Sequence, residues 1–151
     1  MNTAGFQLAP DIKGDSDEDT ELLLSMADDA RAYLQGMKWC PSLSRLYLAF
    51  GIGGVVAIFL AELDPKSALQ DQFLWIVVGD LPSAYLVAES ATPREALETY
   101  CALMTDWIEA VELGRSLDEV FPVAANPTLE AAAQLRRRIE FLKERILPSL
   151  A

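Results

Sequence analysis

Residues 43–63 read LSRLYLAFGIGGVVAIFLAEL, and the fold depends on this stretch. Its two parts, Leu43–Phe50 and Val55–Leu63, are rich in the β-branched and aromatic side chains that favour strands. The glycine-rich segment 51–54 between them suits the tight connection of a hairpin. A membrane-spanning helix needs about 20 helix-compatible apolar residues, whereas the apolar run here, 46–61, is shorter and contains three glycines. The stretch instead predicts two adjacent antiparallel strands.

The same glycines raise a second interpretation, a phosphate-binding loop, because glycine lets backbone N–H groups come close to a phosphate. Such a loop follows a strand and opens a helix, and it carries a Lys-Ser or Lys-Thr pair. Here a strand-like run follows the glycines and that pair is missing. We therefore expect the connection to be a hairpin turn or a bulge.

Two more strands are expected at Phe73–Val78 and Ala84–Ala88, with the turn sequence Gly-Asp-Leu-Pro at 79–82 between them. Such short connections favour antiparallel neighbours. Residues 55–61 and 73–78 are apolar at nearly every position, which is typical of strands that are covered on both faces. We expect the cover to come from helices or from a second subunit.

Three segments, at about 17–35, 92–114 and 128–147, have the three- and four-residue spacing of apolar side chains that indicates amphipathic helices. The element order is therefore α-β-β-β-β-α-α. This order predicts an α+β fold with a four-stranded, mostly antiparallel sheet packed by three helices.

The chain has 151 residues and a formal net charge of −11, most of which lies near the N-terminus. Residues 1–30 carry eight acidic side chains and one lysine. Residues 1–16 have few apolar side chains, so we expect a flexible acidic tail, followed by a single α+β domain over 17–151. The tail lacks the basic and apolar regions of a secretory signal, which predicts a cytoplasmic protein.

The composition excludes several chemistries. The chain has no histidine, so it cannot build a Ser-His-Asp nucleophile or a His-ligated zinc site. The excess of acids argues against nucleic acid and anionic membranes as partners. Cys40 and Cys101 match no metal-binding spacing and have apolar neighbours, which predicts buried, reduced thiols. We expect no cofactor, no metal and no catalysis.

Asp80 is the strongest candidate for a site, because it follows a buried strand. With Glu62 and Asp64 near the end of a neighbouring strand, it could act as a base or a metal ligand. The structural alternative is that Asp80 stabilises the Gly-Asp-Leu-Pro turn by bonding nearby N–H groups. Trp39, just past the first helix, is the tryptophan expected to be partly exposed and to contribute to a pocket. The three arginines at 136–138 are expected on a solvated helix flank, paired with acids.

The function expected first is a non-catalytic interaction module that neutralises or holds a basic protein through complementary charge. In size and charge the chain is similar to bacterial immunity proteins, which neutralise a basic toxin, and to secretion chaperones. The chaperone pattern places a helix between the third and fourth strands, and residues 78–84 are too few for one. The acids expected to bind the partner lie on the second helix: Glu95, Glu98, Asp106, Glu109 and Glu112.

Two alternatives remain open. One is a small-molecule-binding protein or a carboxylate-based enzyme with its site near Asp80. The other is a structural subunit that forms a homodimer through an apolar sheet face or through the last helix. That helix carries an apolar seam in which Leu135, Ile139, Leu142 and Ile146 repeat at four, three and four residues.

Overall fold

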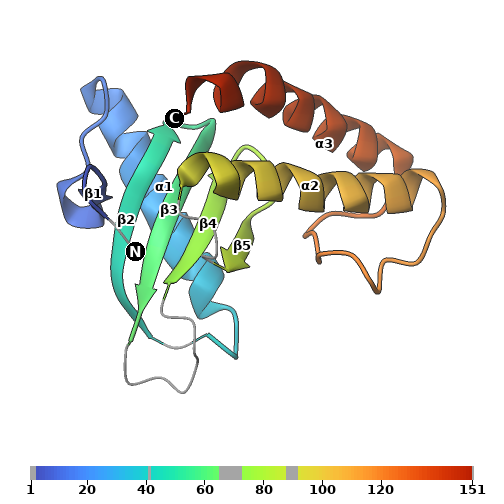
Figure 1. Cartoon of the computed structure of the whole chain (residues 1–151), viewed down its shortest axis with the longest axis horizontal. Helices are drawn as coiled ribbons and strands as arrows, with labels where there is room; N and C mark the ends of the chain where they lie inside the picture. The colour runs from blue at the N-terminus through green and yellow to red at the C-terminus, as the bar shows by residue number, and fades with distance from the viewer. Residues whose placement is uncertain (1–2, 41, 65–72, 88–91, 151) are drawn as a thin grey trace.

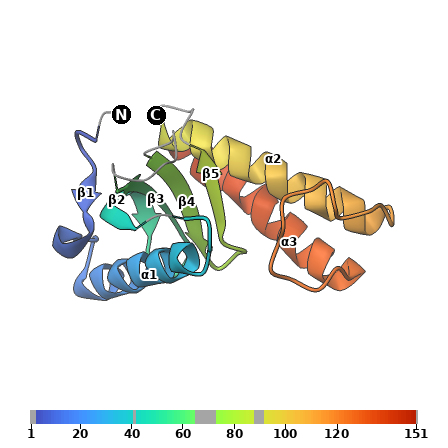
Figure 2. The same cartoon turned by 90° about the horizontal axis from the view of Figure 1, so that it is seen from below.

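The structure is a computed structural model that describes residues 3–40, 42–64, 73–87 and 92–150. An antiparallel sheet lies at its centre, with one helix against one face and two helices against the other (Figure 1; Figure 2). The α+β class is confirmed. The described part of the chain holds the three expected α-helices, but its sheet has five strands rather than four.

The strands lie in the sheet in the order in which they occur in the chain, and every neighbouring pair is antiparallel. Their bounds are β1 Gln7–Leu8, β2 Leu43–Ile52, β3 Val56–Leu63, β4 Phe73–Gly79 and β5 Ala84–Val87. The four strands expected from the sequence are β2 to β5. Residue 88, which we expected to end the last of them, lies outside the described residues.

The additional strand, β1, comes from the segment that the sequence predicts to be a tail. Gln7 pairs with Leu48 and Leu8 pairs with Tyr47. Just beyond β1, Ala9 and Ile12 are buried in the core beneath α1 (Asp17–Gln35). Composition could not reveal this strand, because the segment needs few apolar side chains. Two buried side chains and two strand pairs are enough to place it beside β2, which is already part of the sheet.

The two faces of the sheet are separated cleanly in β3. Ala57, Phe59, Ala61 and Leu63 belong to the core beneath α1, whereas Val56, Ile58 and Leu60 belong to the core beneath α2 (Pro93–Glu112) and α3 (Leu129–Phe141). Helices of the same chain therefore cover both faces. The continuous apolar pattern of β3 and β4 is explained without a second subunit.

The glycine segment is a hairpin turn, as predicted, and it packs tightly against α1. A side chain at Gly51 would place its Cβ 2.6 Å from Leu23 Cδ2. Gly54 has a φ of +77°, in the left-handed region that favours glycine. The N–H of Gly53 donates to Asp19 Oδ1 at 2.8 Å. Glycine is therefore used here so that a helix and a hairpin can approach each other closely.

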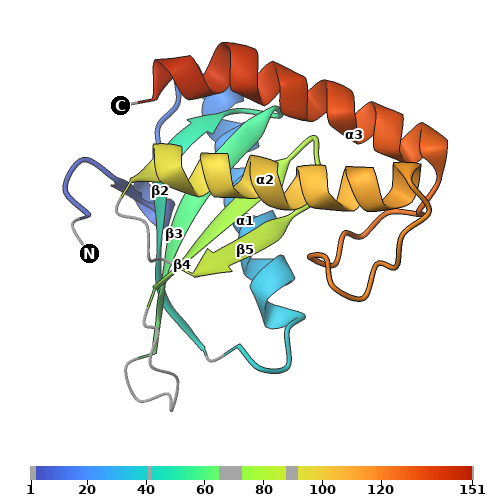
Figure 3. The ribbon, with the colours of Figure 1, turned by 45° about the vertical axis from the view of Figure 1, so that its right-hand side comes forward.

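Each helix begins at a hydroxyl cap: Ser16 for α1, Thr92 for α2 and Thr128 for α3. α3 continues through a π-helical segment, Leu142–Ile146, into a short 3-10 turn. α2 and α3 lie side by side across the sheet (Figure 3). The apolar seam of the last helix is buried against this chain's own core, so neither surface on which the homodimer hypothesis rested is left uncovered.

Candidate functional site

The turn that carries Asp80 is tied to α3. Gly79 has a φ of +148°, and a Cβ there would lie 2.3 Å from the carbonyl oxygen of Val55. The N–H of Asp80 donates to that same oxygen at 3.0 Å. Arg138 Nε donates to the main-chain oxygen of Asp80 at 2.6 Å, and its Nη2 lies 3.5 Å from both carboxylate oxygens. Asp80 thus belongs to a structural turn. Its carboxylate contacts Arg138 of α3 and not, as expected, N–H groups within the turn.

Glu62 and Asp64 do not join Asp80. In the pairing of β3 with β4, Val56 lies opposite Gly79, and Glu62 lies opposite Phe73 at the other end of the strands. Six residues of strand separate the two ends by about 20 Å. The expected cluster of Asp80, Glu62 and Asp64 is therefore wrong, because neighbouring antiparallel strands place their carboxyl ends at opposite ends of the strand pair. Among the described residues, no three Cys, Asp or Glu side chains gather to hold a metal ion.

Trp39 belongs to an aromatic cluster around Tyr85 of β5. The ring centroid of Tyr85 lies 4.8 Å from that of Trp39, 5.5 Å from that of Phe121 and 6.4 Å from that of Tyr33. Trp39 is 44% exposed, in keeping with the expected partial exposure. Burial and the neighbouring Tyr85 raise the pKa of Tyr33 to about 12, so its phenol stays neutral at physiological pH. The cluster is packing between α1, β5 and the segment before α3, and it is not joined to a carboxylate site.

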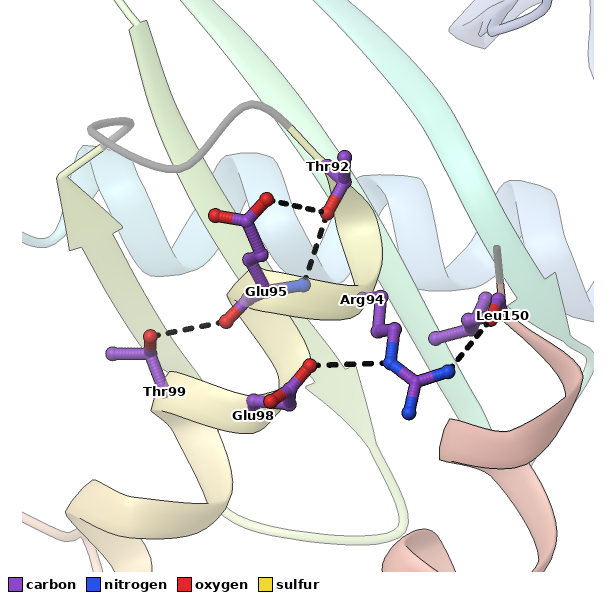
Figure 4. A network of polar contacts seen from close by, with 6 residues as sticks. All are labelled: Thr92, Arg94, Glu95, Glu98, Thr99 and Leu150. Atoms are coloured by element: carbon purple, nitrogen blue, oxygen red, sulfur yellow. Dashed lines mark hydrogen bonds and ion pairs between the residues drawn. The ribbon is translucent and has the colours of Figure 1, made fainter.

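Three of the five acids expected on α2 have partners within the chain, and Figure 4 shows two of them, Glu95 and Glu98. At the start of α2 the N–H of Glu95 donates to Thr92 Oγ1 at 3.2 Å, and the Thr92 hydroxyl donates to Glu95 Oε1 at 3.2 Å. Glu98 pairs with Arg94 at 3.2 Å, and Arg94 also donates to the carbonyl oxygen of Leu150. Glu112 pairs with Arg136 of α3. Glu95 and Glu98 therefore have their partners within α2 or at its cap, and Glu112 links α2 to α3.

The other two expected acids, Asp106 and Glu109, lie beside a shallow hollow of about 330 Å³. Arg115 and Ser116 from the segment after α2 line the same hollow, as does Glu119. The acidic charge of α2 is therefore interrupted by a base at this end as well.

The arginines at 136–138 have different roles. Arg136 bridges α3 to α2, Arg138 bridges α3 to the Asp80 turn, and Arg137 is exposed. All three keep exposed side-chain surface, and Arg136 and Arg138, each 41% exposed, pair with acids as expected, although those acids lie outside α3. The spacing of acids in the sequence could not show these contacts, because Glu112 and Asp80 are 24 and 58 residues away.

α1 carries the most concentrated acidic charge in the chain, although the acids expected to bind a partner all lie on α2. Between Gly14 and Ala30 there are seven acids and no base. Asp19 is used within the fold, since Oδ1 accepts from Gly53 and Oδ2 from the N–H of Asp15. Five others are exposed on the helix and form what we call the acidic face of α1: Asp17, Glu18, Glu21, Asp28 and Asp29.

The acidic face of α1 is continuous. With about 100° of rotation per residue, its five carboxylates fall within roughly 120° of arc, opposite the buried stripe of the helix. Only Asp28 has an ion pair among the described residues, with Arg31 at 3.1 Å. Leu22 and Leu24 flank the face and are 39% and 37% exposed. The acidic face therefore has an exposed apolar side chain on each flank.

The two cysteines are free thiols and are not bonded to each other. Cys101 is buried, as predicted, and burial raises its pKa to about 11. Cys40 is only partly buried, so the prediction of burial is wrong for this residue. It follows the end of α1, where the chain turns towards β2, and it packs against the margin of the core beneath α1. Neither thiol has the low pKa of a reactive cysteine.

Comparison of the chain with protein-family models, with curated proteins and with solved structures gives no match. Within the described residues, no helix combines the length and the apolar character that a membrane crossing requires.

Proposed function

We propose that the chain is a non-catalytic binding module that uses the acidic face of α1 to recognise a basic protein partner. The observation that carries this proposal is the run of five exposed carboxylates on one helix face, four of them without an ion pair among the described residues. α1 covers the outside of the sheet along its length, so a partner can approach this face directly (Figure 2). Complementary charge speeds such an encounter and disfavours acidic competitors.

The acids of α2 support this role less well. Glu98 and Glu112 are paired with arginines of the chain, and Glu95 is part of the helix cap. Withdrawing these carboxylates from their partners would offset part of the energy gained from a new partner. We therefore assign the partner surface to α1 rather than to the α2 residues expected from the sequence. Neutralising or holding a basic protein, as immunity proteins do, remains the expected role.

The test compares two charge-reversal variants with the native chain as bait in extracts of the native host. One variant carries Glu18→Lys, Glu21→Lys and Asp29→Lys on α1; the other carries Asp106→Lys, Glu109→Lys and Glu119→Lys around the α2 hollow. Both change the formal charge equally, and all six positions are exposed. We expect a basic protein that the native chain and the α2 variant retain at low salt and release as salt rises. The α1 variant should not retain it.

Equal retention by all three baits, or a complex that is indifferent to salt, would show that the acidic face of α1 is not the partner surface. Circular dichroism and thermal unfolding of both variants confirm that a loss of binding is not a loss of folding.

A further inference from the structure

The outer edge of β2 is paired along only part of its length. β1 pairs with Leu48 and Tyr47 and then ends, because the chain turns out of the sheet through the 3-10 turn Ala9–Asp11. β2 continues past this point to Leu43 and pairs with β3 on its other side. In the part of the chain that the structure describes, no strand pairs with the outer edge of residues 43–46.

A cavity of about 600 Å³ lies at this unpaired edge. Its lining residues run from Leu8, where β1 leaves the sheet, to Gln35 at the C-terminal end of α1, and include all of residues 42–46. Buried Leu34, Leu46 and Ala9 provide an apolar floor. The volume is within the range of sites that enclose a small ligand or a few residues of a peptide.

The side chains around this cavity differ in charge from the rest of the molecule. Arg31 and Arg45 are among the lining residues, and no Asp or Glu is. Arg31 has Asp28 as its ion-pair partner, but the Asp28 side chain is 78% exposed, so this pair is screened by water and is weak. Arg45 is exposed and lies across the strand pair from Glu62. In a chain of net charge −11, a cavity lined by two arginines favours an anionic occupant.

We propose that this cavity binds an extended, acidic peptide segment of another protein, which adds to the sheet as a strand beside residues 43–46. The unpaired N–H and C=O groups of a strand edge are satisfied best by another strand, and the pockets beside the edge then select the side chains. The guanidinium groups of Arg31 and Arg45 would each meet a carboxylate of the peptide. The site is separate from the acidic face of α1 and does not depend on the function proposed for it.

The experiment uses a six-residue peptide of alternating valine and glutamate, blocked at both ends, titrated into the isotopically labelled full chain. We expect the largest shifts of backbone amide signals at residues 43–46. Arg31→Gln and Arg45→Gln should each weaken binding by about ten-fold or more, because each removes a charge-assisted hydrogen bond. Arg115→Gln, an exposed arginine at the α2 hollow, is the matched control and should leave the affinity unchanged.

Three further ligands separate the strand from other occupants: the same peptide with lysine in place of glutamate, the acidic peptide with methylated backbone nitrogens, and octanoate. None of the three should shift the amide signals of 43–46. The proposal is overturned if the acidic peptide does not bind, if it shifts other residues instead, or if its affinity is unchanged in both arginine variants. Equal binding of the methylated peptide would also overturn it, since backbone hydrogen bonds would then not be needed. Equal binding of octanoate would overturn it too, since the cavity would then be a pocket for small anions.

Discussion

The carboxylate of Asp19 on α1 accepts a hydrogen bond from the main-chain N–H of Gly53 at 2.8 Å, and this contact joins the helix to the hairpin between β2 and β3. The other carboxylate oxygen accepts from the N–H of Asp15 at 2.9 Å. One side chain therefore fixes both the start of α1 and the position of the helix on the sheet. Asp19 lies within the acidic run of the sequence, yet its role is different from that of its exposed neighbours.

Replacing Asp19 with alanine should lower the free energy of unfolding by about 1–3 kcal/mol, because two hydrogen bonds to a charged acceptor are lost. Asp29→Ala is the matched control, since Asp29 is an exposed acid of the same helix, and it should change stability by less than about 0.5 kcal/mol. Urea unfolding followed by circular dichroism measures both. Equal effects of the two substitutions would contradict the role assigned to Asp19.

Gly79→Ala should destabilise the chain more than Gly114→Ala. Both glycines have a positive φ, so both substitutions introduce backbone strain of about 1–2 kcal/mol. At Gly79 the new Cβ would also lie 2.3 Å from Val55 O, whereas at Gly114 it meets nothing within 4 Å. Thermal unfolding of the two variants should show a clearly larger fall in Tm for Gly79→Ala. A similar fall in Tm for both variants would show that the close approach of Val55 O to position 79 adds no cost beyond the backbone strain.

Removing the Asp80 carboxylate should have little effect on stability, because the short contact of Arg138 is with the main-chain oxygen of Asp80. Asp80→Asn keeps that bond and loses only a contact at 3.5 Å, made by a carboxylate that is 73% exposed. Arg138→Ala removes the bond and should cost about 0.5–1.5 kcal/mol. Arg137→Ala serves as the control, since Arg137 is exposed. A large loss of stability in Asp80→Asn alone would mean that the carboxylate, not the main chain, holds the turn.

Stability should fall as the pH rises above about 9, and Cys101 should contribute to the fall. Burial raises the pKa of its thiol from 9.0 to about 11 in the folded chain. Between these values the unfolded state has lost a proton that the folded state keeps, so rising pH favours unfolding. Cys101→Ala should flatten the dependence between pH 9 and 11, and chemical unfolding at a series of pH values measures it. An unchanged slope in Cys101→Ala would contradict this account of the thiol.

The sheet was predictable because its central strands carry their own signal. The apolar pattern of β3 and β4 is a property of consecutive residues, and it indicates two covered faces whatever the rest of the chain does. β1 carries no such signal: Gln7–Leu8 becomes a strand only because the edge of β2 is there to pair with. The same holds for Arg136 and Arg138, whose partners lie far away in the sequence and are found only when α3 packs beside α2 and the Asp80 turn.

The candidate site was less predictable than the fold. Asp80, Glu62 and Asp64 were correctly placed near the carboxyl ends of their strands, but the carboxyl ends of neighbouring strands lie side by side only where the strands are parallel. The antiparallel order already expected from the short connections implies that β3 and β4 end at opposite edges. The acidic charge of α1 could be predicted from the sequence. Which acids pair with arginines could not, because some partners lie far apart in the chain. That distribution, with α2 partly neutralised and α1 largely unpaired, is why we propose α1 rather than α2 as the partner surface.

Whether the acidic face of α1 binds a basic partner is tested most directly by the salt dependence of the dissociation constant. It is measured for the native chain and for the triple variant Glu18→Lys, Glu21→Lys, Asp29→Lys. If the acidic face of α1 provides the attraction, affinity for the native chain falls steeply between low and physiological salt. The variant then binds weakly at low salt and shows little further dependence. An affinity and a salt dependence that are the same in both proteins would contradict the claim.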